Sequence, residues 1–520
     1  MDPAEAIYQQ AWMLQQPIQA AQALGDSEIQ QFYSGKTVFL TGGTGFLGKL
    51  LIEKLIRSCN INKLYLLIRE KKSKTARERL RSLIKDSVFD ELRGKNPNFA
   101  RKIIPVEGDV AEQQLGIRDE VWHDLAEEVN IIFHVAGTTK FNECLKRATL
   151  INVRGTRETL LLAQHCKQLR SYVYVSTAYS HAIRSRIGSE ILEKFYPCPV
   201  PPNSLIELAE NMENDSLTDG WPNTYTFTKA VAEELIRAKS DDMPVCIVKP
   251  PIVICTYKEP SPGWIDKSAI YGASGVCLFA MIGFLHVIWV INPRISLIPA
   301  DYANNLIIAA GRDTAINHNK GDKRLKIYIH SSSKITSIWG MYHDTGTLST
   351  PKSFFYRFII ETPNKFVFWV LSWFLHYIPS YVADGVSQVL GLKKPLGIKS
   401  FVKQHAKLYE TWMLLSYFVN NEWNLSDDNT VDLYNKMSKT DKDLFNFDVM
   451  SINWDELITI WGLGMRKYII KDGLKDTARG IRRQFWKKIE TYVILAIYAY
   501  VIFKISYLVL SLLTFCLKLL

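Results

Sequence analysis

The feature that most constrains the fold is a glycine-rich turn between a short apolar run and an amphipathic helical segment. Residues 37–40 (TVFL) have the composition of a buried strand, residues 41–48 read TGGTGFLG, and apolar residues recur at helical spacing from 46 to 57. Glycine lets the backbone turn tightly and approach a ligand, and the N-terminus of the following helix attracts a phosphate group. A strand, a glycine turn and a helix in this order indicate a dinucleotide-binding unit. The candidate cofactor-binding residues in the turn are Gly42, Thr44, Gly45, Phe46, Leu47 and Gly48.

Five more apolar runs follow, each separated from the next by a segment with helical periodicity. Continuous apolar strands that alternate with helices are typical of a parallel sheet covered on both faces. We therefore expect an α/β fold with a doubly wound parallel sheet, the Rossmann type of domain. The runs occupy residues 64–68, 103–106, 131–135, 172–175 and 245–248.

Changes in this pattern define the domain organisation. Residues 1–33 are rich in Gln and Ala and have little apolar periodicity, so we expect a flexible or loosely helical extension. Residues 34–345 form the expected dinucleotide-binding domain together with its substrate-binding elements. Strand signals stop after about residue 345, and residues 352–472 are rich in Phe, Trp and Tyr, which predicts a second, mostly helical domain.

The C-terminal segment, residues 490–520, is predicted to anchor the chain in a membrane. Residues 492–517 are almost wholly apolar apart from Lys504, whose long side chain can extend toward the interface, and a spanning helix needs about 20 residues. A buried helix, or a hairpin in one leaflet that turns at Lys504, is the alternative. Basic residues precede the segment, as on a cytosolic flank: Arg479, Arg482, Arg483, Lys487 and Lys488.

The N-terminal sequence MDPAEAIYQQ has no basic region followed by an apolar core, so we expect no signal peptide and a catalytic part that faces the cytosol. Apolar C-terminal anchors with basic flanks occur in the endoplasmic reticulum and in peroxisomes, so both membranes remain alternatives for the location of this chain.

Composition narrows the class of partner. The net charge of +11 suits nucleic acid, a membrane surface or a phosphorylated ligand, but no nucleic-acid-binding motif accompanies it. The eight cysteines are scattered without a C-x-x-C pair, so we expect neither a disulfide framework nor a metal site. The same pattern predicts a reducing compartment. Part of the charge lies between Lys71 and Arg81, which fits a solvated helix face or a site for phosphates.

The end of the second apolar run bears on cofactor choice. Arg69 follows this run directly, and an arginine there suits the 2′-phosphate of NADPH through bidentate contacts. Glu70 is the competing residue, since a carboxylate that points inward would accept the ribose hydroxyls of NAD. We expect NADPH.

The candidate catalytic residues lie between the fifth and the sixth apolar runs. Tyr225 and Lys229 form Y-x-x-x-K at the start of a predicted helix, where they share one face. The lysine can then lower the pKa of the phenol and hold the nicotinamide ribose, while the tyrosine donates a proton to a carbonyl that receives hydride. A tyrosine and a lysine on a solvated helix face is the alternative. A hydroxyl from Ser176 or Thr177 should hydrogen-bond the substrate carbonyl, and Thr177 is ranked slightly ahead.

Separated motifs resemble known families. Gly42, Gly45 and Gly48 have the spacing of the short-chain dehydrogenase superfamily, and Asp109 and Val110 match its pattern, in which the aspartate hydrogen-bonds the adenine. From about residue 34 to the end, the chain resembles alcohol-forming fatty acyl-CoA reductases. The motifs are TGGTGFLG (41–48), LLIREKK (66–72), FHVAGTTKFNE (133–143), NVRGT (152–156), YVSTAYSHA (174–182), EKFYPCP (193–199), YTFTKAVAEEL (225–235), VKPPIVICTYKEPSPGWID (248–266), NNEWNLSDDNT (420–430), FNFDVMSINW (445–454) and GLGMRKYIIKD (462–472).

The resemblance implies an extended short-chain dehydrogenase fold and a two-step, NADPH-dependent reduction of long-chain acyl-CoA to a primary alcohol, with release of coenzyme A. It also implies that residues 276–291 and 354–381, which are apolar and aromatic, form an acyl tunnel, dip into the bilayer or are core helices.

Some positions depart from the resemblance. The families commonly have arginine and serine around Lys249 and Pro251, asparagine at Lys267, alanine at Gly137 and, in many extended short-chain dehydrogenases, the catalytic serine at Ala178. Two alternatives therefore stay open. One is a membrane-bound dehydrogenase or epimerase acting on a sterol, another lipid or a nucleotide sugar; the other is a membrane protein that binds NADPH without turnover.

Overall fold

A seven-stranded parallel sheet forms the centre of the computed structural model, which describes residues 1–211, 218, 220–291, 295–332, 346–392, 394 and 398–519. The strand order is β11-β7-β5-β4-β1-β2-β3, with every neighbouring pair parallel. This confirms the doubly wound α/β fold. The strands are β1 (Thr37–Thr41), β2 (Lys63–Ile68), β3 (Ile103–Glu107), β4 (Ile131–His134), β5 (Ser171–Val175), β7 (Val245–Lys249) and β11 (Lys326–Ile329).

Six strands coincide with the six apolar runs, and β11 is the strand that the sequence pattern missed. It is short, follows a charged stretch and lies at the edge of the sheet, so it lacks a long apolar run.

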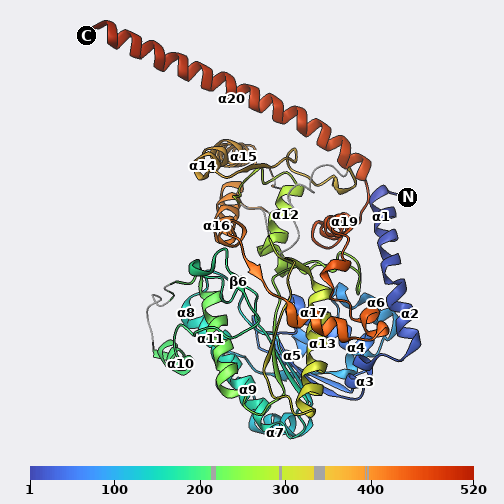
Figure 1. Ribbon diagram of the computed structural model, residues 1–520. Helices are drawn as coiled ribbons and strands as arrows, with labels where there is room; N and C mark the ends of the chain where they lie inside the picture. The colour runs from blue at the N-terminus through green and yellow to red at the C-terminus, as the bar shows by residue number, and fades with distance from the viewer. Residues whose placement is uncertain are drawn as a thin grey trace.

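Helices cover both faces of the sheet (Figure 1). One face packs on α4 (Phe46–Ser58) and α13 (Ala300–Asn319), through side chains such as Leu51 and Ile307. The other packs on α7 (Asp119–Glu128), α9 (Gly155–His165) and α11 (Thr224–Lys239). The carboxyl ends of the strands are therefore left to hold a ligand, as in other open α/β sheets.

Residues 3–33 form helices packed on the body, where we expected a flexible or loosely helical extension. They form α1 (Pro3–Ala11), η1 (Trp12–Gln15), α2 (Gln16–Leu24) and α3 (Glu28–Tyr33). Ala4, Tyr8 and Ala11 are buried at helical spacing, and the Gln15 amide donates to the carbonyls of Lys258 and Pro260. An apolar stripe built largely from alanine is weak in the sequence, although it is enough to dock a helix.

The N-terminus is joined to the far end of the chain. Asp2 caps α1 by accepting from the N–H of Ala4, and the same carboxylate accepts from the N–H and the hydroxyl of Thr477, the first residue of α20. The Tyr8 and Tyr468 hydroxyls lie 3.1 Å apart. The two termini of the globular body are thus fixed against each other.

The later helices are not wholly separate from the sheet. Leu433, Leu444 and Phe445 belong to the core that also holds α4 and α13, and the Thr430 hydroxyl donates to the carbonyl of Ile329 in β11. Residues 333–345, the end of the predicted dinucleotide-binding domain, lie outside the described residues. The later helices include α12 (Ala273–Met281), α14 (Lys365–Ser372), the π-helix η10 (Trp373–Tyr377), α15 (Ile378–Val389), α16 (Phe401–Val419), α17 (Asp428–Lys436), α18 (Lys439–Leu444), α19 (Trp454–Gly464) and the π-helix η13 (Met465–Ile470).

Three short parallel pairs tie these segments to the body, two of them through strands beyond residue 345, where no strand was expected. The remaining helices lie around the sheet. The pairs are β8 (Ile252–Ile254) with β10 (Leu297–Pro299), β9 (Val287–Trp289) with β12 (Ile360–Thr362), and β6 (Glu190–Ile191) with β13 (Asn424–Leu425); the helices are α5 (Ala76–Leu83), α6 (Asp90–Lys95), α8 (Leu145–Thr149), the π-helix η5 (Leu150–Arg154) and α10 (Pro202–Asn211).

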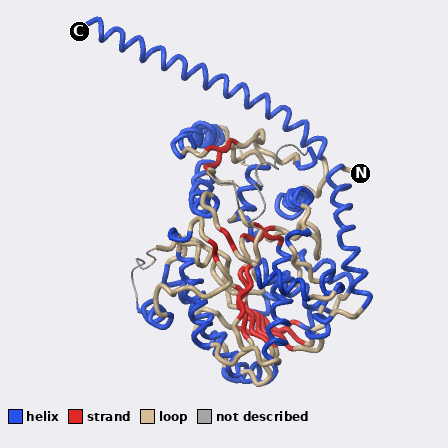
Figure 2. The backbone as a smooth tube through the Cα atoms, in the orientation of Figure 1, coloured by secondary structure: helices blue, strands red, loops and turns tan. Residues whose placement is uncertain are grey.

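The C-terminal helix α20 (Thr477–Leu519) projects from the body as one rod (Figures 1 and 2). It is continuous through Lys504, so the hairpin alternative does not hold. Its described side chains after Tyr492 are mostly exposed, and residues 477–512 are long and apolar enough to cross a membrane. The segment 365–389, formed by α14, η10 and α15, meets the same length and composition criterion.

Candidate active site

The loop between β1 and α4 is packed so closely against the backbone that two of its positions accept only glycine. Gly42 has a φ of +79°, and a Cβ there would lie 2.6 Å from the amide nitrogen of Ala136. A Cβ on Gly48 would lie 2.3 Å from the carbonyl oxygen of Gly42. Gly45 precedes the first turn of α4, and no side chain caps that turn. The loop therefore fits a pyrophosphate at the helix N-terminus.

A basic cluster lies at the end of β2, beside this loop. Arg69 points toward Asp109, with 3.5 Å between its guanidinium and the carboxylate, whereas Glu70 is exposed. Arg79 of α5 donates to the carbonyl of Arg69 and approaches the Thr44 hydroxyl at 3.5 Å. The pKa of Lys71 is lowered by the charge of Arg69, then by burial and by Arg79. This electropositive end of β2 suits a phosphate on the ribose.

The sequence pattern did not single out Arg79, because it lay within the basic stretch. The signal was a capping box: Thr75 and Glu78 fix the start of α5, and this orients Arg79 toward the glycine loop. On the other side, Asp109 accepts from the N–H of Ala111, and Val110 packs under α9, where a Cβ on Gly155 would lie 2.9 Å from its carbonyl oxygen.

Tyr225 and Lys229 lie one turn apart at the start of α11, as the spacing predicted. The Lys229 ammonium donates to the carbonyl of Val175 at 2.8 Å and lies 3.3 Å from the Tyr174 hydroxyl. Burial lowers the pKa of Lys229 to about 7. Burial also raises the pKa of the Tyr225 phenol to about 12, against the opposing effect of its hydrogen bond with Thr177.

The two candidate hydroxyls at the end of β5 point in different directions. The side chain of Thr177 hydrogen-bonds the Tyr225 phenol, so the structure brings these two hydroxyls together. Ser176 is buried and donates to a Glu233 carboxylate oxygen at 2.5 Å. Ala178 is also buried, and its N–H donates to the carbonyl of Pro250. Thr177 is thus the hydroxyl that contacts Tyr225, and Ser176 belongs to a second, buried cluster.

This second cluster was missed by sequence reasoning. Glu233 follows Lys229 by one turn of α11, and its carboxylate lies 3.0 Å from the Lys249 ammonium and 3.4 Å from His181. All three side chains are buried. Burial opposes the charge, but Lys249, His181 and Ser176 outweigh it and lower the pKa of Glu233 to about 2. Glutamate in a helical pattern normally indicates a solvated face, and only the fold brings Lys249 to it.

Asn152 is a further residue that the pattern did not identify. It lies in η5, donates to the Thr228 hydroxyl at 2.9 Å and accepts from the N–H of Thr138 at 2.9 Å. Beside it, a Cβ on Gly137 would lie 3.2 Å from the Asn152 side-chain oxygen and 3.4 Å from the Lys229 nitrogen. The segment NVRGT that contains Asn152 carried part of the family resemblance. Its wide π-helical turn was the feature that sequence periodicity could not reveal.

Two family profiles match the chain, both described as male sterility protein. The NAD-binding one covers residues 40–307, and the second covers residues 375–472. The protein "Fatty acyl-CoA reductase wat" of Drosophila melanogaster is 34% identical over 486 residues, which is 91% of this chain and 92% of that protein. "Fatty acyl-CoA reductase 1" of Homo sapiens is 34% identical over 459 residues, 85% of this chain and 86% of that one.

Solved structures share the fold at lower identity. The terminal R domain of the myxalamid PKS-NRPS pathway has a TM-score of 0.56 and 18% identity, covering 84% of this chain and 92% of that one. The R domain of a nonribosomal peptide synthetase from Mycobacterium tuberculosis also has a TM-score of 0.56 and 18% identity, covering 89% and 98%.

Proposed function

The chain belongs to the fatty acyl-CoA reductase family, and we propose that it uses NADPH to reduce a long-chain fatty acyl-CoA to a primary alcohol. It is an oxidoreductase with a Rossmann domain that binds a nicotinamide cofactor. The observation that carries the proposal is the meeting of Tyr225 and Thr177 beside the buried Lys229. This arrangement supports proton delivery to a carbonyl at the carboxyl ends of the strands.

Bound NADPH supplies hydride to the carbonyl carbon of the thioester. Tyr225 donates its phenolic proton to the carbonyl oxygen, while the Thr177 hydroxyl holds that oxygen by a hydrogen bond. The hemithioacetal hydroxyl then returns its proton to the Tyr225 phenolate as the C–S bond breaks, and the thiolate takes up a proton from water and leaves as coenzyme A. A second NADPH, bound in place of the NADP⁺, would supply the hydride for the aldehyde, and Tyr225 donates its proton again to give the alcohol and is reprotonated from water.

Lys229 serves the same proton transfer. When the substrate and the cofactor ribose are in place, a protonated ammonium beside the phenol lowers the pKa of Tyr225 from its raised value of about 12. The Val175 carbonyl orients the ammonium, and a Cβ on Gly137 would lie 3.4 Å from the same nitrogen, so the glycine leaves space beside it.

Product analysis tests the reaction. Membranes that contain the full chain are incubated with NADPH and acyl-CoA of several chain lengths, and the extracted lipids are resolved. We expect alcohols that are absent with Tyr225→Phe, which should still bind NADPH. Bound NADPH without aldehyde or alcohol from any chain length would overturn the proposal and favour a binding protein. Oxidation of NADPH by a sterol but not by acyl-CoA would favour the other dehydrogenase reading.

The preference for NADPH rests on Arg69 and Arg79. Charge-assisted hydrogen bonds to a 2′-phosphate contribute about 1.5–3 kcal/mol, so we expect either alanine variant to weaken NADPH binding roughly tenfold to a hundredfold. NADH binding should change little. Arg77 is exposed on the same helix, and Arg77→Ala is the matched control. Equal losses for both nucleotides would refute the assignment.

We also propose that α20 anchors the chain in the endoplasmic reticulum or peroxisomal membrane, with the body in the cytosol. The apolar residues 477–512 and the basic residues at their start support this orientation. Protease treatment of intact organelles should digest the body. Protection of the body, or extraction of the chain by carbonate, would contradict it.

A further inference from the structure

The helical stretch from α14 through η10 to α15 has its polarity reversed with respect to the protein body. Its body-facing side begins with Phe368 and continues with polar residues at four-residue intervals, Ser372, His376 and Ser380, and all four side chains are buried. The wide π-helical turn of η10 keeps these residues in line, since four residues slightly exceed one α-helical turn. Its outward side carries large apolar residues. They are Phe366, Val367, Trp369, Trp373, Tyr381, Val382, Val386 and Val389.

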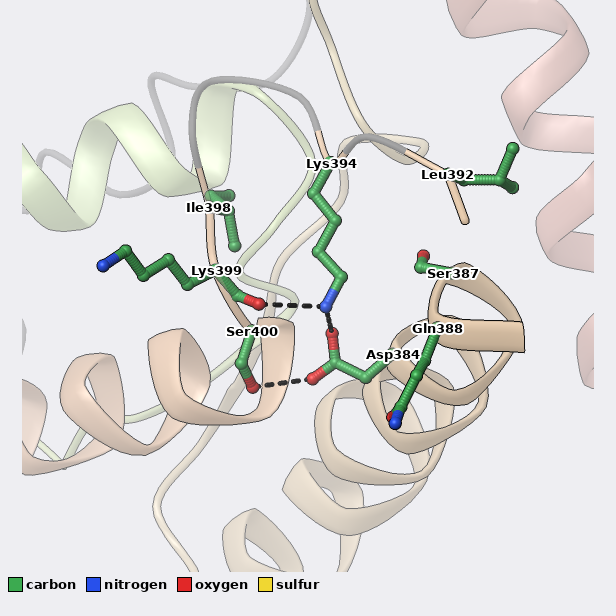
Figure 3. Close-up of a pocket in the computed structure, with 8 residues that line it drawn as sticks. All are labelled: Asp384, Ser387, Gln388, Leu392, Lys394, Ile398, Lys399 and Ser400. Atoms are coloured by element: carbon green, nitrogen blue, oxygen red, sulfur yellow. Dashed lines mark hydrogen bonds and ion pairs between the residues drawn. The ribbon is translucent and has the colours of Figure 1, made fainter. Parts of the chain in front are cut away.

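Hydrogen bonds hold the polar side to the body. The His376 ring accepts from the N–H of His286 at 2.9 Å. Asp384 accepts from the Ser400 hydroxyl at 2.7 Å and from the N–H of Phe401 at 3.0 Å, so it caps the start of α16. Figure 3 shows its carboxylate between Ser400 and the ammonium of Lys394. These bonds fix the stretch on the surface and argue against an independent membrane span.

The outward side is unsuited to water. Phe366 is 70% exposed and Val389 is 84% exposed, and no Asp, Glu, Lys or Arg lies between Lys365 and Asp384. Apolar residues that form a continuous exposed face mark an interaction site rather than a solvated surface. A helix with polar residues inward and apolar residues outward matches an apolar environment outside the protein.

The outward side is continuous with the apolar part of α20. The Phe374 ring in η10 meets the Tyr498 ring with 6.0 Å between centroids, and α20 passes over α14 and α15 (Figure 1). Both segments carry exposed aromatic residues, Trp369 on α14 and Tyr492 on α20, a residue type that is enriched at bilayer interfaces. Lys487 and Lys488 precede them on α20, where they can meet lipid phosphates.

We infer that α14, η10 and α15 lie in the interface of the bilayer that α20 enters, with the outward apolar side among the acyl chains. This inference rests on the membrane helix proposed above. The depth expected of such a helix is about 5–10 Å below the headgroups, which is shallower than the centre of a spanning helix. The body is then attached at two places, and its helical half faces the lipid.

Fluorescence quenching tests this second attachment. The variants Trp369→Cys, Val386→Cys, Val501→Cys and Met450→Cys each carry an environment-sensitive dye, in a full-length background with Cys144→Ser, Cys198→Ser and Cys516→Ser, so that the other native cysteines are buried. The protein is reconstituted into vesicles of phosphatidylcholine with some phosphatidylserine. Met450 is 79% exposed and reports water, and Val501 in α20 reports the anchor. All four labelled variants share the same background sequence and the same lipid composition.

We expect dyes at Trp369 and Val386 to emit at shorter wavelength and to be quenched most by lipids with a nitroxide near the headgroup. The dye at Val501 should be quenched most by a nitroxide deep in the chain, and the dye at Met450 by aqueous iodide. Iodide quenching at Trp369 and Val386 with a lipid-quenched Val501 would overturn the inference and leave the anchor intact. Iodide quenching at Val501 would overturn both. Shielding of Trp369 and Val386 from both quenchers would indicate a protein partner and also overturn it.

Discussion

Replacing Lys229 with methionine should stabilise the protein without nucleotide while abolishing turnover. The Lys229 ammonium is buried, and the hydrogen bonds to Val175 and Tyr174 do not replace its hydration. Burial therefore lowers its pKa from 10.5 to about 7. A methionine has a similar length and fills the same space without a charge. The variant therefore removes the free-energy cost of burying the Lys229 ammonium.

The size of the effect follows from proton linkage. Between pH 7 and 10.5 the unfolded chain binds a proton that the folded chain has released, so the stability of the wild type rises with pH across this window. Each pH unit corresponds to about 1.4 kcal/mol, and the cost is therefore about 3 kcal/mol at pH 8 and close to 5 kcal/mol at pH 6. The variant also loses the hydrogen bond to Val175, which reduces the gain in stability by about 1 kcal/mol. The net gain is about 2 kcal/mol at pH 8 and about 4 kcal/mol at pH 6.

Thermal unfolding of the detergent-solubilised full chain measures this gain. We expect Lys229→Met to raise the Tm by a few degrees without nucleotide, and by more at pH 6 than at pH 8. The exposed Lys85 offers a matched control, since Lys85→Met should change neither the Tm nor its pH dependence. A lower Tm for Lys229→Met, or an equal gain at both pH values, would refute the reasoning.

Other substitutions test the remaining parts of the structure. Gly48→Ala places a Cβ 2.3 Å from a loop carbonyl, so it should weaken nucleotide binding at least roughly tenfold in a fluorescence titration; unchanged affinity would contradict the fit of the loop. Lys249→Met leaves Glu233 buried without its main counter-ion and should cost about 3–5 kcal/mol in denaturant unfolding, whereas the double variant with Glu233→Gln should cost less. Additive losses would show that the pair does not act as a unit. Asp2→Ala removes the carboxylate that accepts from Thr477 and should cost about 0.5–2 kcal/mol, seen as faster proteolysis near the start of α20; an unchanged cleavage rate would argue against this cap.

The sheet could be predicted because its strands are buried on both sides and therefore read as apolar runs. Strand β11 could not, because a four-residue edge strand such as Lys326–Ile329 carries no such run. The N-terminal helices were missed for a related reason, since alanine and glutamine give little contrast between the two faces of a helix.

The residues of the candidate site also fall into those that the sequence could predict and those that only the fold reveals. Tyr225 and Lys229 are neighbours on one helix, so their spacing alone places them together. Thr177 could be narrowed only to a strand end shared with Ser176, because alternation decides which hydroxyl faces the sheet's interior and which faces Tyr225. Glu233 meets Lys249 only after α11 packs on the sheet, and no periodicity in one sequence records such a contact.

The cap that Asp2 places on α20 has a consequence for biogenesis. The Asp2 carboxylate cannot reach Thr477, which lies 475 residues later in the chain, until Thr477 has left the ribosome. Helix α1 can therefore complete its contact with the start of α20 only after the residues between them have been synthesised. A tag fused directly before Asp2 would lie beside the contact between Asp2 and Thr477, on the side of the molecule from which α20 departs.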